Sequence, residues 1–272
     1  MRRKRQEYAQ FVKQHYNPES TMELTEQESK VLVQILKDVR RVSQGIPVFE
    51  LDKVQECLQR ILYIWAIRNP ASGYVQGIDG LVLPFFLVFL SEHVEEEHVE
   101  KCDINPLFKT DAVNQIEADC FWCLSKLLDR MYDHYTPGQP GLQRMTFKLE
   151  ELVRRTDAAL HTHLDTEGLK FELFSPRWMN CQLMRELPLQ AIIRLWDTYL
   201  VGDQGFTQFH VYVCASFLLS FSAKLQGMDF EGCFLFVQDL PTKQWGAVEA
   251  ETLLSQAFML STFFHNAPSH LS

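Results

Sequence analysis

The pattern of hydrophobic positions is helical over most of the chain. Apolar residues recur at intervals of three and four in residues 54–67, again in 116–131, and again from Leu142 to Leu160. No segment alternates between apolar and polar residues with the β-branched enrichment typical of a strand, and the nearest one, 234–240, is ambiguous. The pattern therefore predicts an all-α protein.

Short segments rich in Gly and Pro separate the predicted helices. Residues 136–141 have the composition of a loop, and Gly168 lies where a helix is expected to end. From about residue 171 the chain is denser in Phe, Trp and Leu. We therefore expect two packed helical subdomains, residues 1–168 and 169–272, with a loosely defined boundary.

Composition and charge limit the classes of partner that the protein is expected to bind. The chain has 272 residues, of which 46% are hydrophobic, so it can bury a substantial core. Its net charge of −9 argues against binding to nucleic acid or to an anionic membrane surface, because both require a positive face. The one basic run, MRRKR at the N-terminus, is typical of a solvated tail. The apolar run 81–90 is too short to span a bilayer, so we expect no direct membrane insertion.

The pattern of cysteines and the lack of a phosphate-binding loop indicate a protein without a cofactor or metal. Seven cysteines, scattered mostly among apolar neighbours, fit reduced thiols in the cytoplasm better than a disulfide framework. Cys120 and Cys123 form a Cys-x-x-Cys pair, but no second pair accompanies it to complete a zinc site. No Gly-rich phosphate loop of the GxxxxGKS type occurs, so the chain is not expected to bind nucleotide itself.

One segment places an arginine next to a carboxylate. In residues 35–41, ILKDVRR, Asp38 and Arg41 are three residues apart and share a helix face, where they can pair. A guanidinium oriented in this way matches the geometry of phosphate oxygens. Taken alone, an ordinary surface ion pair explains the segment equally well.

A second segment, NPASGYVQGID at 69–79, places Tyr74 and Gln76 in a tight bend. Gly73 and Gly77 leave little side chain around them. The glutamine amide has both a donor and an acceptor but cannot act as a base, so it suits holding a water molecule or a phosphate oxygen. Taken alone, the bend is equally well explained by a loop whose tyrosine packs and whose glutamine satisfies backbone groups.

Together the two segments resemble the signature motifs of the TBC-domain Rab GTPase-activating proteins. The matching residues are Ile35-x-x-Asp38-x-x-Arg41 and Tyr74-x-Gln76. FSPRWMNCQLMRELPLQAIIRLWDTYL (174–200) resembles the RW…RE…RLWD block of that family. IWAIRNPASGYVQG is similar to its catalytic loop, and is nearest to the subgroup whose loop reads WAIRHPASGYVQG. The similarity extends over almost the whole chain.

The resemblance implies acceleration of GTP hydrolysis by a Rab GTPase, and thereby regulation of vesicle trafficking. Arg41 would be an arginine finger that stabilises developing negative charge, and Gln76 a glutamine finger that orients the attacking water. Asp38 would hold Arg41, and Tyr74 would shape the loop that presents Gln76. The supporting residues of the two motifs would be Ile35, Asp38, Tyr74 and Gly77.

The resemblance also implies the partners and the location. The partner would be a GTP-bound Rab, which carries the GTP and Mg²⁺, so this chain would need no cofactor and hydrolyse no nucleotide by itself. The protein would be cytoplasmic and peripherally associated with endomembranes. The Golgi is the expected address, and a Golgi scaffold protein would be a further partner.

Three departures from the family pattern leave an alternative open. The family often has Thr where this chain has Val42, and Asn where it has Asp79, which Gly80 follows. The upstream RxxxW motif is absent from this sequence. Asp79 adds negative charge near a site that meets phosphates, so weaker or altered activity is expected. The alternative is an adaptor of the same fold that binds a small GTPase or a Golgi scaffold protein without stimulating hydrolysis.

The RW…RE…RLWD block has a structural interpretation. Its spacings place Arg, Glu and Asp near large aromatic side chains. We interpret these residues as core and as buried ion pairs that hold the two subdomains together, not as GTPase contacts. They are Trp178, Arg185, Glu186, Arg194, Trp196 and Asp197.

Overall fold

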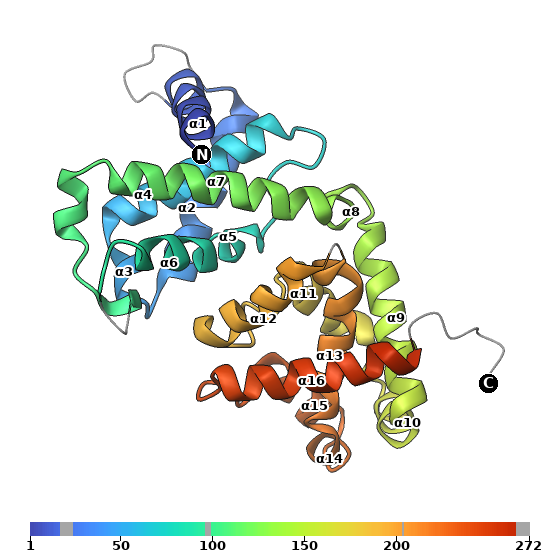
Figure 1. The fold of residues 1–272 in the computed structure, drawn as a ribbon. Coiled ribbons are helices and arrows are strands. Elements are labelled where there is room, and N and C mark those ends of the chain that lie inside the picture. Colours follow the sequence, from blue (N-terminus) through green and yellow to red (C-terminus); the bar gives the residue numbers. More distant parts are fainter. Residues whose placement is uncertain (17–23, 96–98, 203, 265–272) are drawn as a thin grey trace. The chain divides into compact units, whose positions relative to one another are not determined.

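The computed structural model describes residues 1–16, 24–95, 99–202 and 204–264. Every regular element in these residues is a helix and none is a strand, which confirms the all-α prediction (Figure 1). The ambiguous segment 234–240 lies mostly within helix α15 (Phe230–Gln238). Helix α15 buries Cys233 and Val237, which are four residues apart and lie on one helix face.

The helices form two compact units, Met1–Pro137 and Gly138–Ser272. The elements of the first unit are α1 (Arg2–His15), α2 (Glu26–Ser43), α3 (Pro47–Glu50), α4 (Asp52–Arg68), α5 (Ile78–Leu81), α6 (Leu83–Ser91), the 3-10 helices η1 (Val99–Lys101) and η2 (Asn105–Lys109), α7 (Ala112–Arg130) and α8 (Tyr132–Tyr135). Within it α4 packs against both α2 and α7, and α7 also packs against α1 and α6.

The second unit is built around a buried helix, α13 (His210–Leu219), which contacts α9, α11 and α16. Its other elements are α9 (Pro140–Thr156), α10 (Ala158–Glu167), η3 (Phe171–Leu173), α11 (Ser175–Asn180), α12 (Leu189–Val201), the π-helical η4 (Gly205–Phe209), α14 (Ser222–Leu225), α15 and α16 (Ala247–Phe264). The division between the units therefore precedes α9, whereas the sequence suggested Gly168. The reason is that α9 buries its apolar face against α11 and α13, so it belongs with the helices that follow it.

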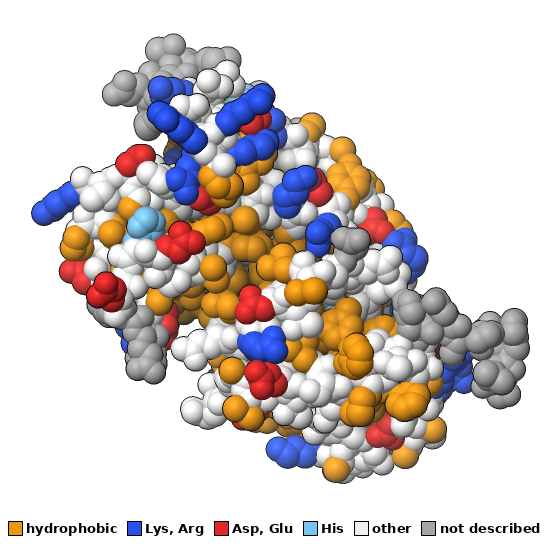
Figure 2. All heavy atoms as spheres, in the orientation of Figure 1, with side chains coloured by type: hydrophobic (Ala, Val, Ile, Leu, Met, Phe, Trp, Pro, Cys, Tyr) orange, Lys and Arg blue, Asp and Glu red, His pale blue; other side chains and the backbone are white. Residues whose placement is uncertain are grey.

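The basic N-terminal run is not a solvated tail, so that prediction was wrong. It is the first part of α1, which carries exposed Lys and Arg side chains (Figures 1 and 2). In the same helix Tyr8 and Phe11 are buried, and their rings lie 4.8 and 6.2 Å from the ring of Phe121 in α7. Apolar burial of this kind is what fixes a helix of this length to a neighbour.

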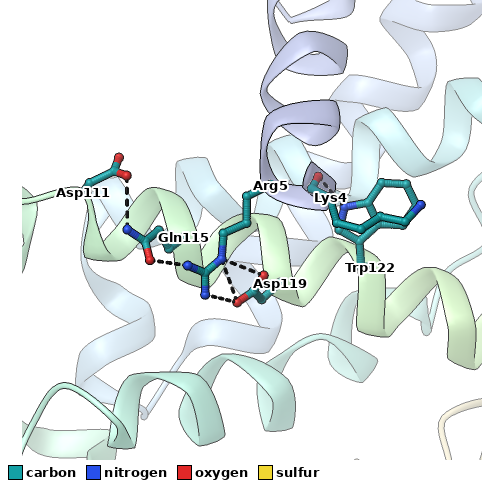
Figure 3. A network of polar contacts seen from close by, with 6 residues as sticks. All are labelled: Lys4, Arg5, Asp111, Gln115, Asp119 and Trp122. Atoms are coloured by element: carbon teal, nitrogen blue, oxygen red, sulfur yellow. Dashed lines mark hydrogen bonds and ion pairs between the residues drawn. The ribbon is translucent and has the colours of Figure 1, made fainter. Parts of the chain in front are cut away.

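Polar contacts also join α1 to α7 (Figure 3). Arg5 reaches Asp119 with Nη2 at 2.6 Å and Nε at 3.0 Å, and its Nη1 donates to Gln115. The indole N–H of Trp122 donates to the backbone oxygen of Lys4 at 2.9 Å, while the Lys4 ammonium lies over the Trp122 ring. Two basic residues of the run, Lys4 and Arg5, therefore contact α7 through their side chains.

The apolar run 81–90 spans the end of α5 and most of α6. In the part of the chain that the structure describes, no helix is long and apolar enough to cross a membrane. Within the same residues, no three His, Cys, Asp or Glu side chains are grouped so that they could hold a metal ion. Cys120 is fully buried in α7 and Cys123 is partly buried there.

Candidate functional site

The position of Arg41 follows from how α2 begins and packs. Thr25 and Glu28 form a reciprocal capping box, with Glu28 N–H donating to Thr25 Oγ1 at 3.2 Å and Thr25 N–H to Glu28 Oε2 at 2.9 Å. Ile35 and Val39 are fully buried on the face that packs against α4. This face fixes the rotation of the helix, so that Asp38 points inward while Arg41 remains 46% exposed.

Asp38 is a fully buried carboxylate with three partners. Arg41 Nη2 lies 2.8 Å from its Oδ1, while the Tyr74 hydroxyl donates to Oδ2 at 2.9 Å and Gln34 Nε2 donates to it at 3.0 Å. Burial raises the pKa of Tyr74 well above its usual value, and the negative charges of Asp79 and Asp38 raise it further. The hydroxyl therefore stays protonated and serves as a donor that joins the second segment to α2.

The bend before α5 depends on two glycines. Gly73 and Gly77 have φ of 65° and 110°, a region that side chains with a Cβ rarely adopt. The N–H of Gly73 donates to the backbone oxygen of Asn69 at 2.8 Å, which closes the turn after α4. Gly77 precedes the first residue of α5 and occupies its N-cap. Gln76 therefore projects from a hydrogen-bonded bend between α4 and α5.

Gln76 and Arg41 lie in direct contact. With the amide oxygen facing the guanidinium, Gln76 accepts from Arg41 Nη1 at 2.8 Å and from Nη2 at 3.1 Å. Both side chains are exposed. The structure therefore brings together, on the surface of the first unit, the two residues that the sequence motifs single out.

Asp79 belongs to the same cluster. Its Oδ1 accepts the Gly77 N–H at 2.7 Å, and its Oδ2 lies 3.7 Å from Arg41 Nη2. The sequence identified Asp79 only as a departure from the family, and it gave no role to Gln34. A signal was present for Gln34, which lies one turn before Asp38 and so on the same helix face.

Each remaining predicted site residue has a clear place. Ile35 anchors α2 from within the core, and Gly77 supplies the backbone of the bend. Val42 is partly buried at the end of α2, and Gly80 is buried in α5. In chemical terms the cluster offers a planar cation and a neutral amide at a surface. This pair suits stabilising charge on a phosphate and orienting a water, as opposed to nucleophilic attack.

The RW…RE…RLWD block is largely structural, as interpreted from the sequence. Trp178 is fully buried against Phe174 and Phe217, with ring centroids 5.0 and 5.2 Å away, and Arg177 Nε lies 2.7 Å from buried Glu186. The pairing residue Arg177 was not singled out from the sequence. These contacts all lie within Gly138–Ser272.

Other members of the block differ from that interpretation. Arg185 and Asp197 lie on the solvent side of their segments and are exposed, so neither is part of a buried ion pair among the described residues. Arg194 is partly exposed and lies 3.4 Å from the exposed Glu251. Trp196 is buried, with its ring 5.3 Å from that of Phe206.

Comparison with known proteins identifies the family. The Rab-GTPase-TBC domain model matches residues 2–226. TBC1 domain family member 22B of Homo sapiens is 48% identical over 271 residues, which cover 99% of this chain and 52% of that protein. GTPase-activating protein gyp1 of Schizosaccharomyces pombe is 46% identical over 272 residues, covering 100% and 52%. The chain therefore spans about half the length of the curated relatives it matches.

A solved structure agrees in sequence and in fold. The crystal structure of the Ypt/Rab-GAP domain of Gyp1p is 43% identical, with a TM-score of 0.88 over 97% of this chain and 81% of that one. The match by sequence model, the identity to full-length relatives and the common fold lead to one conclusion: this chain belongs to the Rab-GTPase-TBC domain family.

Proposed function

We propose that this protein is a GTPase-activating protein for Rab-family GTPases, with Arg41 as its arginine finger and Gln76 as its glutamine finger. The observation that carries the proposal is the contact between these two exposed side chains. They come from different segments, which are joined where Asp38 contacts Arg41 and accepts a hydrogen bond from the Tyr74 hydroxyl. The relatives that are named as GTPase-activating proteins support the same function.

The chemistry of phosphoryl transfer explains why such a pair suffices. The reaction needs positioned groups and charge stabilisation more than covalent chemistry. Arg41 would contact the phosphate oxygens as charge develops on them, and Gln76 would hold the attacking water in line. The partner would supply both GTP and Mg²⁺, so the chain needs no cofactor of its own for this role.

The proposed partner is a GTP-bound Rab, and the proposed location is the surface of endomembranes. The Golgi as the specific address, and a Golgi scaffold protein as a further partner, are finer proposals that rest on family resemblance.

The test is GTP hydrolysis by a panel of purified Rab GTPases, with the wild-type protein and with Arg41→Ala, Gln76→Ala and Arg40→Ala. We expect the wild type to accelerate one or a few Rabs. Arg41→Ala should reduce the stimulated rate about 10³-fold or more, and Gln76→Ala about 10²-fold. Arg40 is the matched control, since it is a neighbouring exposed arginine on α2, and its loss should leave the rate within about twofold.

The adaptor alternative predicts a different result. A Rab would bind in its GTP-bound form, hydrolysis would not accelerate, and Arg41→Ala would not alter the rate. Binding measured by calorimetry beside the hydrolysis assay separates these outcomes. Circular dichroism of each variant shows whether a lost rate reflects lost chemistry or lost folding.

A further inference from the structure

The two oxygens of Asp79 contact different parts of the site. Oδ1 accepts the N–H of Gly77, the residue that follows Gln76, at 2.7 Å. Oδ2 faces the guanidinium of Arg41 from 3.7 Å. The Asp79 side chain is 2% exposed and that of Arg41 is 46% exposed, so water screens the attraction between them only in part. One carboxylate thus connects the glutamine loop with the arginine.

Arg41 consequently lies between two buried carboxylates. Asp38 approaches from its own helix and Asp79 from α5, so the three side chains carry a formal charge of −1. A nucleotide phosphate must compete with both carboxylates for the same guanidinium. The surplus negative charge also opposes the approach of phosphate.

The two distances assign different tasks to the carboxylates. Asp38 lies at 2.8 Å and also accepts from Tyr74, so it sets the position of the guanidinium. Asp79 at 3.7 Å is too far for a hydrogen bond and holds Arg41 only through its charge. An asparagine at position 79 would keep an oxygen for the Gly77 N–H and would remove that charge.

We propose that Asp79 is a positioning residue. Its charge holds the Arg41 guanidinium at the surface of its own protein and so limits the rate at which Arg41 reaches the nucleotide of the partner. Its effect on hydrolysis rests on the proposed function above, whereas its effect on the motion of Arg41 does not. Asp79→Asn releases Arg41 while it preserves the bend that presents Gln76. Asp38→Asn is the matched comparison, because it removes the closer charge and the contact that orients the guanidinium.

The first measurement needs no GTPase. The Nε–Hε signal of Arg41 in ¹⁵N-labelled protein, assigned through Arg41→Lys, reports local motion and hydrogen exchange of the guanidinium. In Asp79→Asn we expect exchange of this proton to be about three- to tenfold faster, since one of two opposing charges is lost. If the Arg41 Nε–Hε proton of a folded Asp79→Asn protein exchanges at the wild-type rate, the proposal is overturned. Asp79→Ser, which also keeps an oxygen near Gly77, serves if the asparagine variant does not fold.

The second measurement is the rate of Rab-stimulated hydrolysis. Asp79→Asn should raise kcat by about three- to tenfold, and Asp38→Asn should lower it. The gain must vanish when Asp79→Asn is combined with Arg41→Ala, because the effect acts through that arginine. A rate in Asp79→Asn equal to or below the wild type overturns the proposal. If the wild-type protein stimulates no Rab, the proposed function fails. Exchange of the Arg41 Nε–Hε proton then still tests whether Asp79 restrains Arg41.

Discussion

The first unit contains two clusters built from the same three kinds of side chain: an arginine, a carboxylate and a tyrosine. In each cluster the tyrosine hydroxyl donates to the carboxylate, at 2.9 Å in the first and 2.6 Å in the second. The first cluster consists of Arg41, Asp38 and Tyr74, and the second of Arg60, Glu117 and Tyr8.

The clusters differ in how many nitrogens of the arginine contact the carboxylate and in how exposed the arginine is. Arg60 binds Glu117 with two nitrogens, Nε at 2.9 Å and Nη2 at 2.7 Å, and its side chain is 21% exposed. Burial would lower the pKa of Arg60, but the hydrogen bonds and charge of Glu117 raise it. Arg41 gives Asp38 only Nη2, is 46% exposed and turns toward Gln76. The same combination of side chains therefore forms a largely buried ion pair at Arg60, whereas at Arg41 it presents a cation at the surface.

The largest expected difference is in stability. Arg60→Ala leaves Glu117 buried without its cation, which should lower the free energy of unfolding by about 3–5 kcal/mol. Arg41→Ala should cost only about 1 kcal/mol, because Asp38 keeps its bonds from Tyr74 and Gln34 and the arginine is half-exposed. Urea unfolding followed by circular dichroism measures both variants.

Equal losses in the two variants would contradict the comparison, since they would mean that Arg41 is as much a part of the fold as Arg60. Arg60→Lys sharpens the result. A lysine cannot reproduce the two-nitrogen contact with Glu117, so we expect a smaller but measurable loss of about 1–2 kcal/mol.

A second prediction concerns the tyrosines. Tyr8→Phe removes a hydrogen bond to a buried, charged carboxylate and should lower the unfolding free energy by about 1.5–3 kcal/mol. Burial raises the pKa of Tyr8 well above its usual value, and the charge and hydrogen bond of Glu117 raise it further. Above about pH 10 the unfolded chain loses this proton while the folded protein keeps it, so the stabilisation present at lower pH declines as pH rises.

The measurement is urea unfolding between about pH 9 and 11. Tyr8→Phe should show a smaller decline in stability over this range than the wild type. Tyr74→Phe, whose tyrosine also has a raised pKa, should flatten the decline as well, with a smaller loss at neutral pH. A pH profile that is identical in all three proteins would refute the linkage.

The fold class could be predicted from the sequence for physical reasons. Helical periodicity is local, so burial of the apolar face of α4 follows from its spacing alone. The same holds for the Asp38–Arg41 pair, which is set by one turn of helix. Gly168 ends α10 in the left-handed conformation, as the C-cap rule predicts.

Contacts between distant segments could not be predicted in this way. The apolar spacing from Leu142 to Leu160 runs through a helix break, where Asp157 caps α10 and accepts from the hydroxyl of Ser222. Likewise Arg60 of α4 meets Glu117 of α7, and Asp79 of α5 meets Arg41 of α2. A single sequence shows that a charged residue is present, but not which buried charge it meets.

The smallest expected effect concerns the basic run at the N-terminus. Arg5 is 34% exposed and binds Asp119, which is 5% exposed, so it lies between the two clusters in its degree of burial. Arg5→Ala should lower the unfolding free energy by about 1 kcal/mol and speed hydrogen exchange in α1, because Tyr8 and Phe11 still hold the helix. Arg3→Ala, at an exposed position in the same helix, is the control and should change neither quantity. If the two variants behave alike, the Arg5–Asp119 contact adds nothing to the docking of α1, and apolar packing alone attaches that helix to α7.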